Sequence, residues 1–163
     1  MKRFLYFCLF LFVLAITPAC TVAQSTDSLE EESSFGDFPN EWTSEQNSIV
    51  LSSNPTAYTA LVNEIIIEIE NRGSETISFS HIDYVEKMID GQWYRVPYVE
   101  GTDSIDIELV VKPGNTEVYK LETDFFDYDF TAGSYRIVKP FSFNNNSTEV
   151  MLAVEFEVES NKK

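Results

Sequence analysis

Apolar and polar side chains alternate with a period of two from residue 48 almost to the end of the chain. The last segment, 149–159, shows the pattern most clearly. Its apolar positions are Val150, Leu152, Val154, Phe156 and Val158. Successive side chains of a β-strand point to opposite faces, so this alternation predicts strands with one buried and one solvated face. Because no stretch of useful length has the 3.6-residue period of a helix, an all-β fold is expected.

Turn residues divide the alternating region into short segments. Asp90-Gly91 is a pair that a type I′ hairpin turn favours, because both residues tolerate a positive φ. Lys112 to Asn115 holds proline and glycine in the order of a β-turn. We count seven to nine strands at intervals of roughly ten residues, which is the pattern of a two-sheet sandwich. Residues 45–160 are therefore predicted to form one immunoglobulin-like antiparallel β-sandwich with Greek-key connections.

The segment 130–137 predicts a specific structural feature of such a sandwich. An apolar residue and a turn at Gly133 precede Tyr135, which opens the penultimate strand. In a tyrosine corner, the phenol hydroxyl bonds back to the main chain of the preceding connection. We predict a tyrosine corner at Gly133 and Tyr135, and the alternative is an ordinary strand tyrosine.

Five short motifs follow one another along the alternating region. They are Val85-Glu86-Lys87, Asp90-Gly91, Trp93-Tyr94, Lys112-Pro113-Gly114 and Gly133-x-Tyr135-Arg136. Together they resemble a family of bacterial immunoglobulin-like domains, which occur in small envelope lipoproteins and as appendages of antibiotic-sensor-type membrane metallopeptidases. The resemblance covers about residues 48–159. It implies the fold and an extracellular location, and it implies no catalytic residue or ligand.

The first residues are typical of an export signal. Lys2 and Arg3 precede an apolar run over 4–16, which is too short for a transmembrane helix of about 20 residues. Cys20 follows Ala19, and this resembles the cleavage site of bacterial lipoproteins, in which the cysteine is lipidated. We predict a signal peptide over 1–19 and an anchor at Cys20, with the membrane contacted through the lipid only. The alternative is secretion after ordinary cleavage at Ala23.

Residues 20–44 are rich in serine, threonine and acids, and we predict that they form a flexible acidic tether. Residues 161–163 are predicted to be a short tail. The chain has a formal net charge of −16 at pH 7, with 27 acidic and 11 basic residues. Such a surface repels nucleic acid and anionic lipid headgroups. A monomer is expected, and no disulfide can form in the mature domain because its only cysteine would be the anchor.

His81 is the only histidine, and Ser78, Ser80 and Asp83 lie near it in sequence. A Ser-His-Asp arrangement would need these side chains to converge. On alternating strands they are expected to form a solvated face, and no glycines of a nucleophile elbow surround a serine. The chain is therefore predicted not to be an enzyme and to hold no cofactor.

Asp124, Asp127 and Asp129 form the best candidate for a metal site, because calcium binds six to eight oxygen ligands. Phe125, Phe126, Tyr128 and Phe130 lie between and beside these aspartates. The alternative is that the aromatic residues plug one end of the sandwich while the acids face water.

Trp93, Tyr94 and Tyr98 form an aromatic group that is a candidate binding surface for a protein or glycan. The alternative places one of the first two in the core and the other in a cross-strand pair. The sequence thus predicts a non-enzymatic extracytoplasmic interaction module that binds a protein or an envelope component. A calcium-dependent adhesive or structural domain is the second hypothesis.

Overall fold

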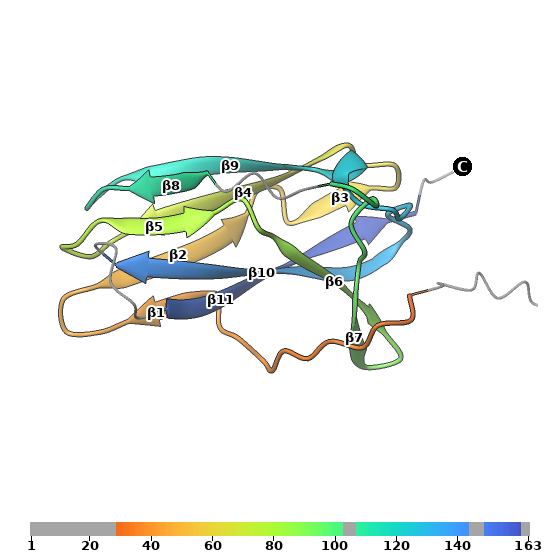
Figure 1. Ribbon diagram of the computed structural model, residues 1–163, viewed down its shortest axis with the longest axis horizontal. Coiled ribbons are helices and arrows are strands. Elements are labelled where there is room, and N and C mark those ends of the chain that lie inside the picture. The colour runs from red at the N-terminus through yellow and green to blue at the C-terminus, as the bar shows by residue number, and fades with distance from the viewer. Residues whose placement is uncertain (1–28, 103–106, 144–148, 161–163) are drawn as a thin grey trace, which may run out of the picture.

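The computed structural model describes residues 29–102, 107–143 and 149–160. Within them, eleven β-strands form two sheets that face each other (Figure 1). The predicted signal peptide over 1–19, the predicted anchor Cys20 and the predicted tail at 161–163 lie outside the described residues. No helix in the described part of the chain is long and apolar enough to cross a membrane.

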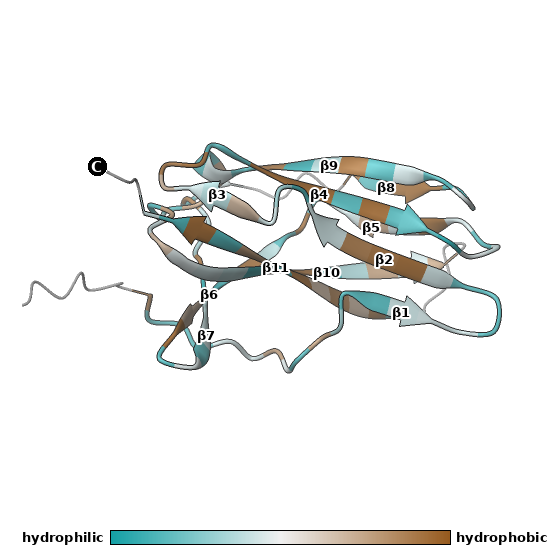
Figure 2. Cartoon of the chain, turned by 180° about the vertical axis from the view of Figure 1, so that it is seen from behind, coloured by the Kyte–Doolittle hydropathy of each residue, from teal (hydrophilic) through white to brown (hydrophobic). Residues whose placement is uncertain are grey.

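The smaller sheet has four antiparallel strands in the order β1-β2-β4-β9. Their bounds are Glu41–Thr43 for β1, Ser48–Ser53 for β2, Glu64–Asn71 for β4 and Thr116–Glu122 for β9. In β2 and β4 every second residue is buried, as the alternation predicts. Figure 2 shows the matching alternation of hydrophilic and hydrophobic bands along β4.

The larger sheet has the order β3-β11-β10-β5-β8, and a ribbon of β6 and β7 joins it through the pairing of β6 with β10. Its bounds are Ala57–Thr59 for β3, Ile77–Ser80 for β5, Tyr84–Ile89 for β6, Gln92–Arg95 for β7, Glu108–Val111 for β8, Gly133–Phe143 for β10 and Glu149–Glu159 for β11. A single 3-10 turn, Thr123–Phe125, follows β9.

The predicted all-β immunoglobulin-like sandwich is confirmed, with two differences in detail. The core between the sheets is a continuous cluster that includes Ile49, Ile67, Tyr135 and Phe156. The strand count exceeds the predicted seven to nine because β1 and β3 are only three residues long and lack a readable alternation. The pairing of β3 with β11 is parallel, whereas an antiparallel sandwich was predicted.

Residues 31–35 lie against the β6–β7 ribbon, and Gly36 and Pro39 bond to β10 and β11, so residues 31–39 are not part of a free tether. The Ser33 N–H donates to the Trp93 carbonyl at 2.8 Å, and the Arg95 N–H donates to the Glu31 carbonyl at 2.8 Å. The Phe35 ring packs edge-on against Tyr84, with 5.0 Å between centroids. The structure therefore differs from the prediction that the tether extends to residue 44, because the aromatic residue of this polar segment finds a partner on the ribbon.

Candidate functional site

The candidate site is built around a break in the larger sheet. β5 pairs with β10 at Ser142 and Phe143, and β6 pairs with the same edge of β10 at residues 135–138. Residues 81–83 connect the two strands and belong to neither. A break of this kind leaves main-chain polar groups without a ladder partner, and buried groups of this type must be satisfied in another way.

Lys139 of β10 fills this break. Its side chain is fully buried, and its Nζ donates to the Ser80 carbonyl at 2.8 Å and to Asp83 Oδ1 at 2.5 Å. The ammonium also lies 4.4 Å from the ring centroid of Tyr119 and 5.0 Å from that of Phe79. The lysine thus replaces the missing ladder hydrogen bond and compensates the buried Asp83 charge.

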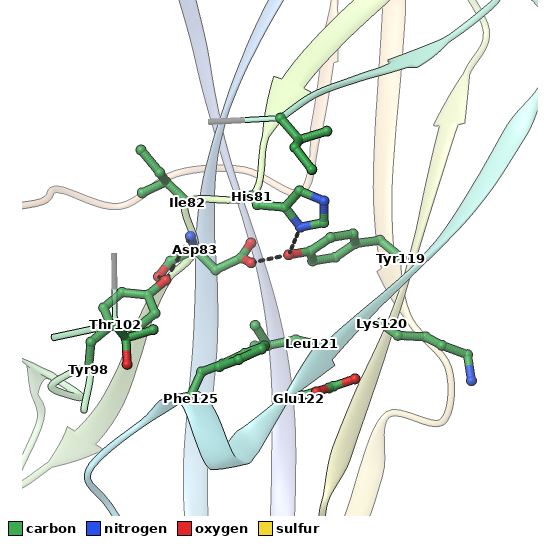
Figure 3. Close-up of a pocket in the computed structure, with 11 residues that line it drawn as sticks. His81, Ile82, Asp83, Tyr98, Thr102, Tyr119, Lys120, Leu121, Glu122 and Phe125 are labelled. Atoms are coloured by element: carbon green, nitrogen blue, oxygen red, sulfur yellow. Dashed lines mark hydrogen bonds between the residues drawn. The ribbon is translucent and has the colours of Figure 1, made fainter. Parts of the chain in front are cut away.

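Two tyrosines complete the hydrogen bonds of Asp83. The hydroxyl of Tyr119, from β9 in the opposite sheet, donates to Asp83 Oδ2 and lies 3.3 Å from His81 Nδ1. The Tyr98 hydroxyl accepts from the Asp83 N–H at 3.0 Å and donates to the Asp83 carbonyl at 2.7 Å. Figure 3 shows the Asp83 carboxylate and the His81 ring both pointing toward the Tyr119 hydroxyl.

Burial shifts the ionisation of this network. It lowers the pKa of the Lys139 amine, although the Asp83 carboxylate opposes the shift. Burial, together with the nearby Asp83 charge, raises the pKa of the Tyr119 hydroxyl. Burial also raises the pKa of Tyr98 to about 12. Both tyrosines are therefore neutral hydrogen-bond donors at physiological pH.

The network forms one wall of a cleft with a volume of about 510 Å³. The cleft is open to solvent, and apolar side chains dominate its remaining walls and rim. Ile107 and Phe125 are each nearly half exposed, at 46% and 47%. The lining residues are His81, Ile82, Asp83, Tyr98, Thr102, Ile107, Tyr119, Lys120, Leu121, Glu122 and Phe125.

The prediction that Ser78, Ser80, His81 and Asp83 form a solvated face is wrong for two of them. Asp83 is only 1% exposed and Ser78 only 4%, whereas His81 is exposed. Among the described residues, no hydrogen bond joins His81 to either serine, so a Ser-His-Asp triad is not assembled. Asp83 was misjudged because Lys139 and Tyr119, which stabilise its burial, lie far from it in sequence.

The candidate calcium site is not formed by the described residues. Asp124, Asp127 and Asp129 are all exposed, and no group of three or more His, Cys, Asp or Glu side chains in the described ranges could hold a metal ion. Phe126 and Phe130 are buried and pack together with 6.0 Å between their centroids. The alternative prediction is that the aromatic residues plug the sandwich while the acids face water. It describes this connection, except that Phe125 is exposed.

Trp93, Tyr94 and Tyr98 do not form one surface. Trp93 and Tyr94 lie on β7 and are half-buried, because residues 31–39 cover part of the ribbon. The Arg136 guanidinium packs over the Trp93 ring, 4.5 Å from its centroid. Tyr98 instead borders the cleft, where its ring stacks on Phe126 with 4.6 Å between centroids. Of the three, only Tyr98 belongs to the candidate site.

The structure places the hydrogen bond of a tyrosine corner at Tyr135. The Tyr135 side chain is buried, and its hydroxyl donates to the Thr131 carbonyl at 2.7 Å. Gly133 between them has a φ of 150°, and a Cβ at this position would lie 3.0 Å from Lys87 Cε. Both the backbone conformation and the close lysine favour glycine here.

Comparison with protein families identifies the domain. Residues 45–159, most of the chain, match the model of the bacterial Ig-like domain. The chain belongs to this family. Membership of the bacterial Ig-like family agrees with the observed sandwich and indicates no catalytic class. No curated protein matches the chain.

Comparison with solved structures finds similarity to chains of low sequence identity. The periplasmic chaperone SfaE has 4% identity and a TM-score of 0.44, with 70% of this chain covered; the chain spans 57% of the SfaE chain. The CARDB domain of the PF1109 protein from Pyrococcus furiosus, solved in complex with di-metal ions, has 16% identity and a TM-score of 0.36, with 73% and 97% of the two chains covered. The ASH/PapD-like domain 7 of human CEP192 has 10% identity and a TM-score of 0.38, with 82% and 100% covered.

Proposed function

We propose that this bacterial Ig-like domain is a non-enzymatic interaction module outside the cytoplasmic membrane, and that its partner binds in the Asp83 cleft. The cleft is the observation that supports the proposal, because exposed apolar side chains surround the polar wall formed by the Asp83 network. Cavities of roughly 300–1,000 Å³ with apolar walls and a few placed polar groups are the usual form of a binding site.

The exposed residues around the cleft support a protein or envelope partner. Tyr98, Val99, Ile107 and Phe125 are each about 40–50% exposed, and the Val99 N–H bonds to the Phe125 carbonyl at 2.9 Å. Large apolar side chains gathered in this way are costly in water and mark interaction sites. A bound partner would cover these apolar side chains, and polar contacts with the Tyr119 hydroxyl and the His81 ring would fix its orientation.

The strands beside the cleft offer a second means of recognition. In the described residues β9 pairs only with β4, and β8 pairs only with β5, so each has one unpaired edge. The two strands belong to opposite sheets and lie along the same long side of the sandwich in Figure 1. Unpaired strand edges present main-chain donors and acceptors to an extended partner segment.

Anchoring through Cys20 completes the proposal. The first residue paired with the ribbon is Glu31. The chain between Cys20 and Glu31 can span at most about 40 Å, from about 3.6 Å for each extended residue. A lipidated Cys20 would therefore hold the domain close to the membrane, which favours a partner in the envelope.

Site-specific photo-crosslinking in living cells tests the cleft. A photoreactive phenylalanine analogue at position 125 is expected to yield a discrete cross-linked product. The same analogue at Gln92 is the control, because Gln92 is exposed on the β6–β7 ribbon and does not line the cleft. Equal products from both positions, or products from position 92 alone, would contradict binding at the cleft.

The anchor is tested by the change Cys20→Ser. The lipid modification supplies the hydrophobic chains that stable membrane attachment requires. We expect the unchanged protein in the membrane fraction, with a lipid mass on Cys20, and the variant in the soluble fraction or the medium. An unmodified N-terminus at Gln24 in the unchanged protein would show that it is secreted instead.

A further inference from the structure

The Lys139–Asp83 pair has features that an ordinary ion pair does not require. The two side chains are 0% and 1% exposed, and Nζ and Oδ1 are 2.5 Å apart. The two residues are close because Tyr84 of β6 pairs with Val138 of β10 at the end of that ladder. Asp83 directly precedes Tyr84, and Lys139 directly follows Val138. A buried ion pair often costs more in desolvation than it returns in attraction, so burial alone does not explain the arrangement.

We propose that the Lys139 amine and the Asp83 carboxyl condense into an intramolecular amide bond. This bond would link β10 covalently to the connection between β5 and β6. The reactants are the two groups already in contact, and the only by-product is water.

The surroundings favour the neutral, reactive form of the Lys139 amine. The rings of Phe79 and Tyr119 pack against the amine, and nearly all water is excluded from the pair. Burial lowers the pKa of Lys139, so the free amine is more accessible than in water. Transfer of one proton from Nζ to Oδ1 along their hydrogen bond converts the ion pair into an amine and a carboxylic acid.

The Tyr119 hydroxyl is placed to assist the reaction. It donates to Asp83 Oδ2, the oxygen on which negative charge develops when Nζ attacks the carboxyl carbon. The new C–N bond forms as the bond from the carbon to Oδ1 breaks. Oδ1 leaves as water, with the proton it received first and a second proton from the attacking nitrogen, and Oδ2 becomes the amide oxygen.

Two further features make the condensation feasible. Groups held in contact reach effective concentrations of about 10⁵–10⁸ M, which offsets the unfavourable formation of an amide in water. Asp83 and Tyr119 also line the cleft, so the released water has a route to solvent.

Both cysteines, Cys8 and Cys20, precede the domain. An amide cross-link would therefore give it the covalent restraint that a disulfide supplies elsewhere.

Mass spectrometry of the purified, folded protein tests the proposal directly. The intact mass is expected to be one water molecule below the mass calculated for the mature chain with its N-terminal processing and lipid included. A tryptic digest is expected to contain peptides 73–87 and 137–162 joined as one species with the same deficit. Full intact mass with two separate peptides would overturn the proposal, as would a deficit confined to peptide 73–87, which is the signature of a cyclised aspartate.

Two tyrosine variants separate the role of Tyr119 from general disturbance of the cleft. Tyr119→Phe removes the donor to the carboxyl group, and we expect a clearly smaller cross-linked fraction at a given time after folding. Tyr98→Phe is the matched control, because its hydroxyl bonds the Asp83 main chain and not the carboxyl group. A loss of the cross-link that is equal in both variants would contradict the role of Tyr119.

Discussion

At the scale of single residues, the larger sheet has a second buried ion pair. Arg136 of β10 donates from Nε to Glu86 Oε2 of β6 at 2.7 Å, and the two side chains are 3% and 0% exposed. Arg136 also donates to the Gly36 carbonyl at 3.1 Å and covers the Trp93 ring. This single guanidinium thus ties together β10, β6, β7 and the N-terminal segment, so its loss should affect more than one contact.

The change Arg136→Met is expected to lower the free energy of unfolding by about 3–5 kcal/mol, because it leaves the Glu86 charge buried without a partner. The double change Glu86→Leu with Arg136→Met should recover much of this loss, since it removes both charges. Urea denaturation of the three proteins measures these differences. A single variant as stable as the unchanged protein would mean that water reaches Glu86.

At the scale of elements, residues 31–39 behave as a strap that crosses the β6–β7 ribbon and continues over β10 and β11. The Phe35 ring lies against Tyr84, and the Arg95 guanidinium lies 5.4 Å from the Phe35 centroid. The Glu31 carboxylate lies 3.3 Å from the same guanidinium, at a largely exposed position that contributes little. The aromatic contact is therefore the part of the strap that stabilises it.

Phe35→Ala is expected to cost about 1–2 kcal/mol, in proportion to the half-buried ring that it removes. It should also speed amide hydrogen exchange at Ser33 and Arg95, whose N–H groups hold the strap to the ribbon. Phe125→Ala serves as the control, because that ring lies exposed at the cleft and its loss should change stability by less than about 0.5 kcal/mol. Unchanged exchange at both amides in the Phe35 variant would mean that the main-chain bonds alone hold the strap.

The elements also show which parts of the structure could be predicted from the sequence. Alternation identified β4 and β11 because each buries one face, and Asp90-Gly91 identified the β6–β7 turn, where both residues have positive φ. β1 was missed because it is only three residues long, and the strap was missed because its partners lie on strands distant in sequence. For the same reason the partnership of Lys139 with Asp83, 56 positions apart, could not be predicted.

At the scale of the whole molecule, the sandwich is tied together by polar as well as apolar contacts between its sheets. Tyr119 from the smaller sheet meets Asp83 and Lys139 of the larger sheet at the point where β5 and β6 separate. That same separation leaves the cleft open and exposes its apolar rim. The separation of β5 and β6 is therefore both the place where Tyr119, Asp83 and Lys139 meet and the origin of the proposed binding surface.

The most direct test of this account is a hydrogen-exchange footprint of the mature protein, recorded with and without solubilised envelope from the source cells. The account predicts slower exchange confined to peptides that border the cleft, those containing residues 81–83, 97–102 and 116–126, and no change over β6–β7 or β2. Protection of the β6–β7 ribbon with an unaffected cleft would contradict it.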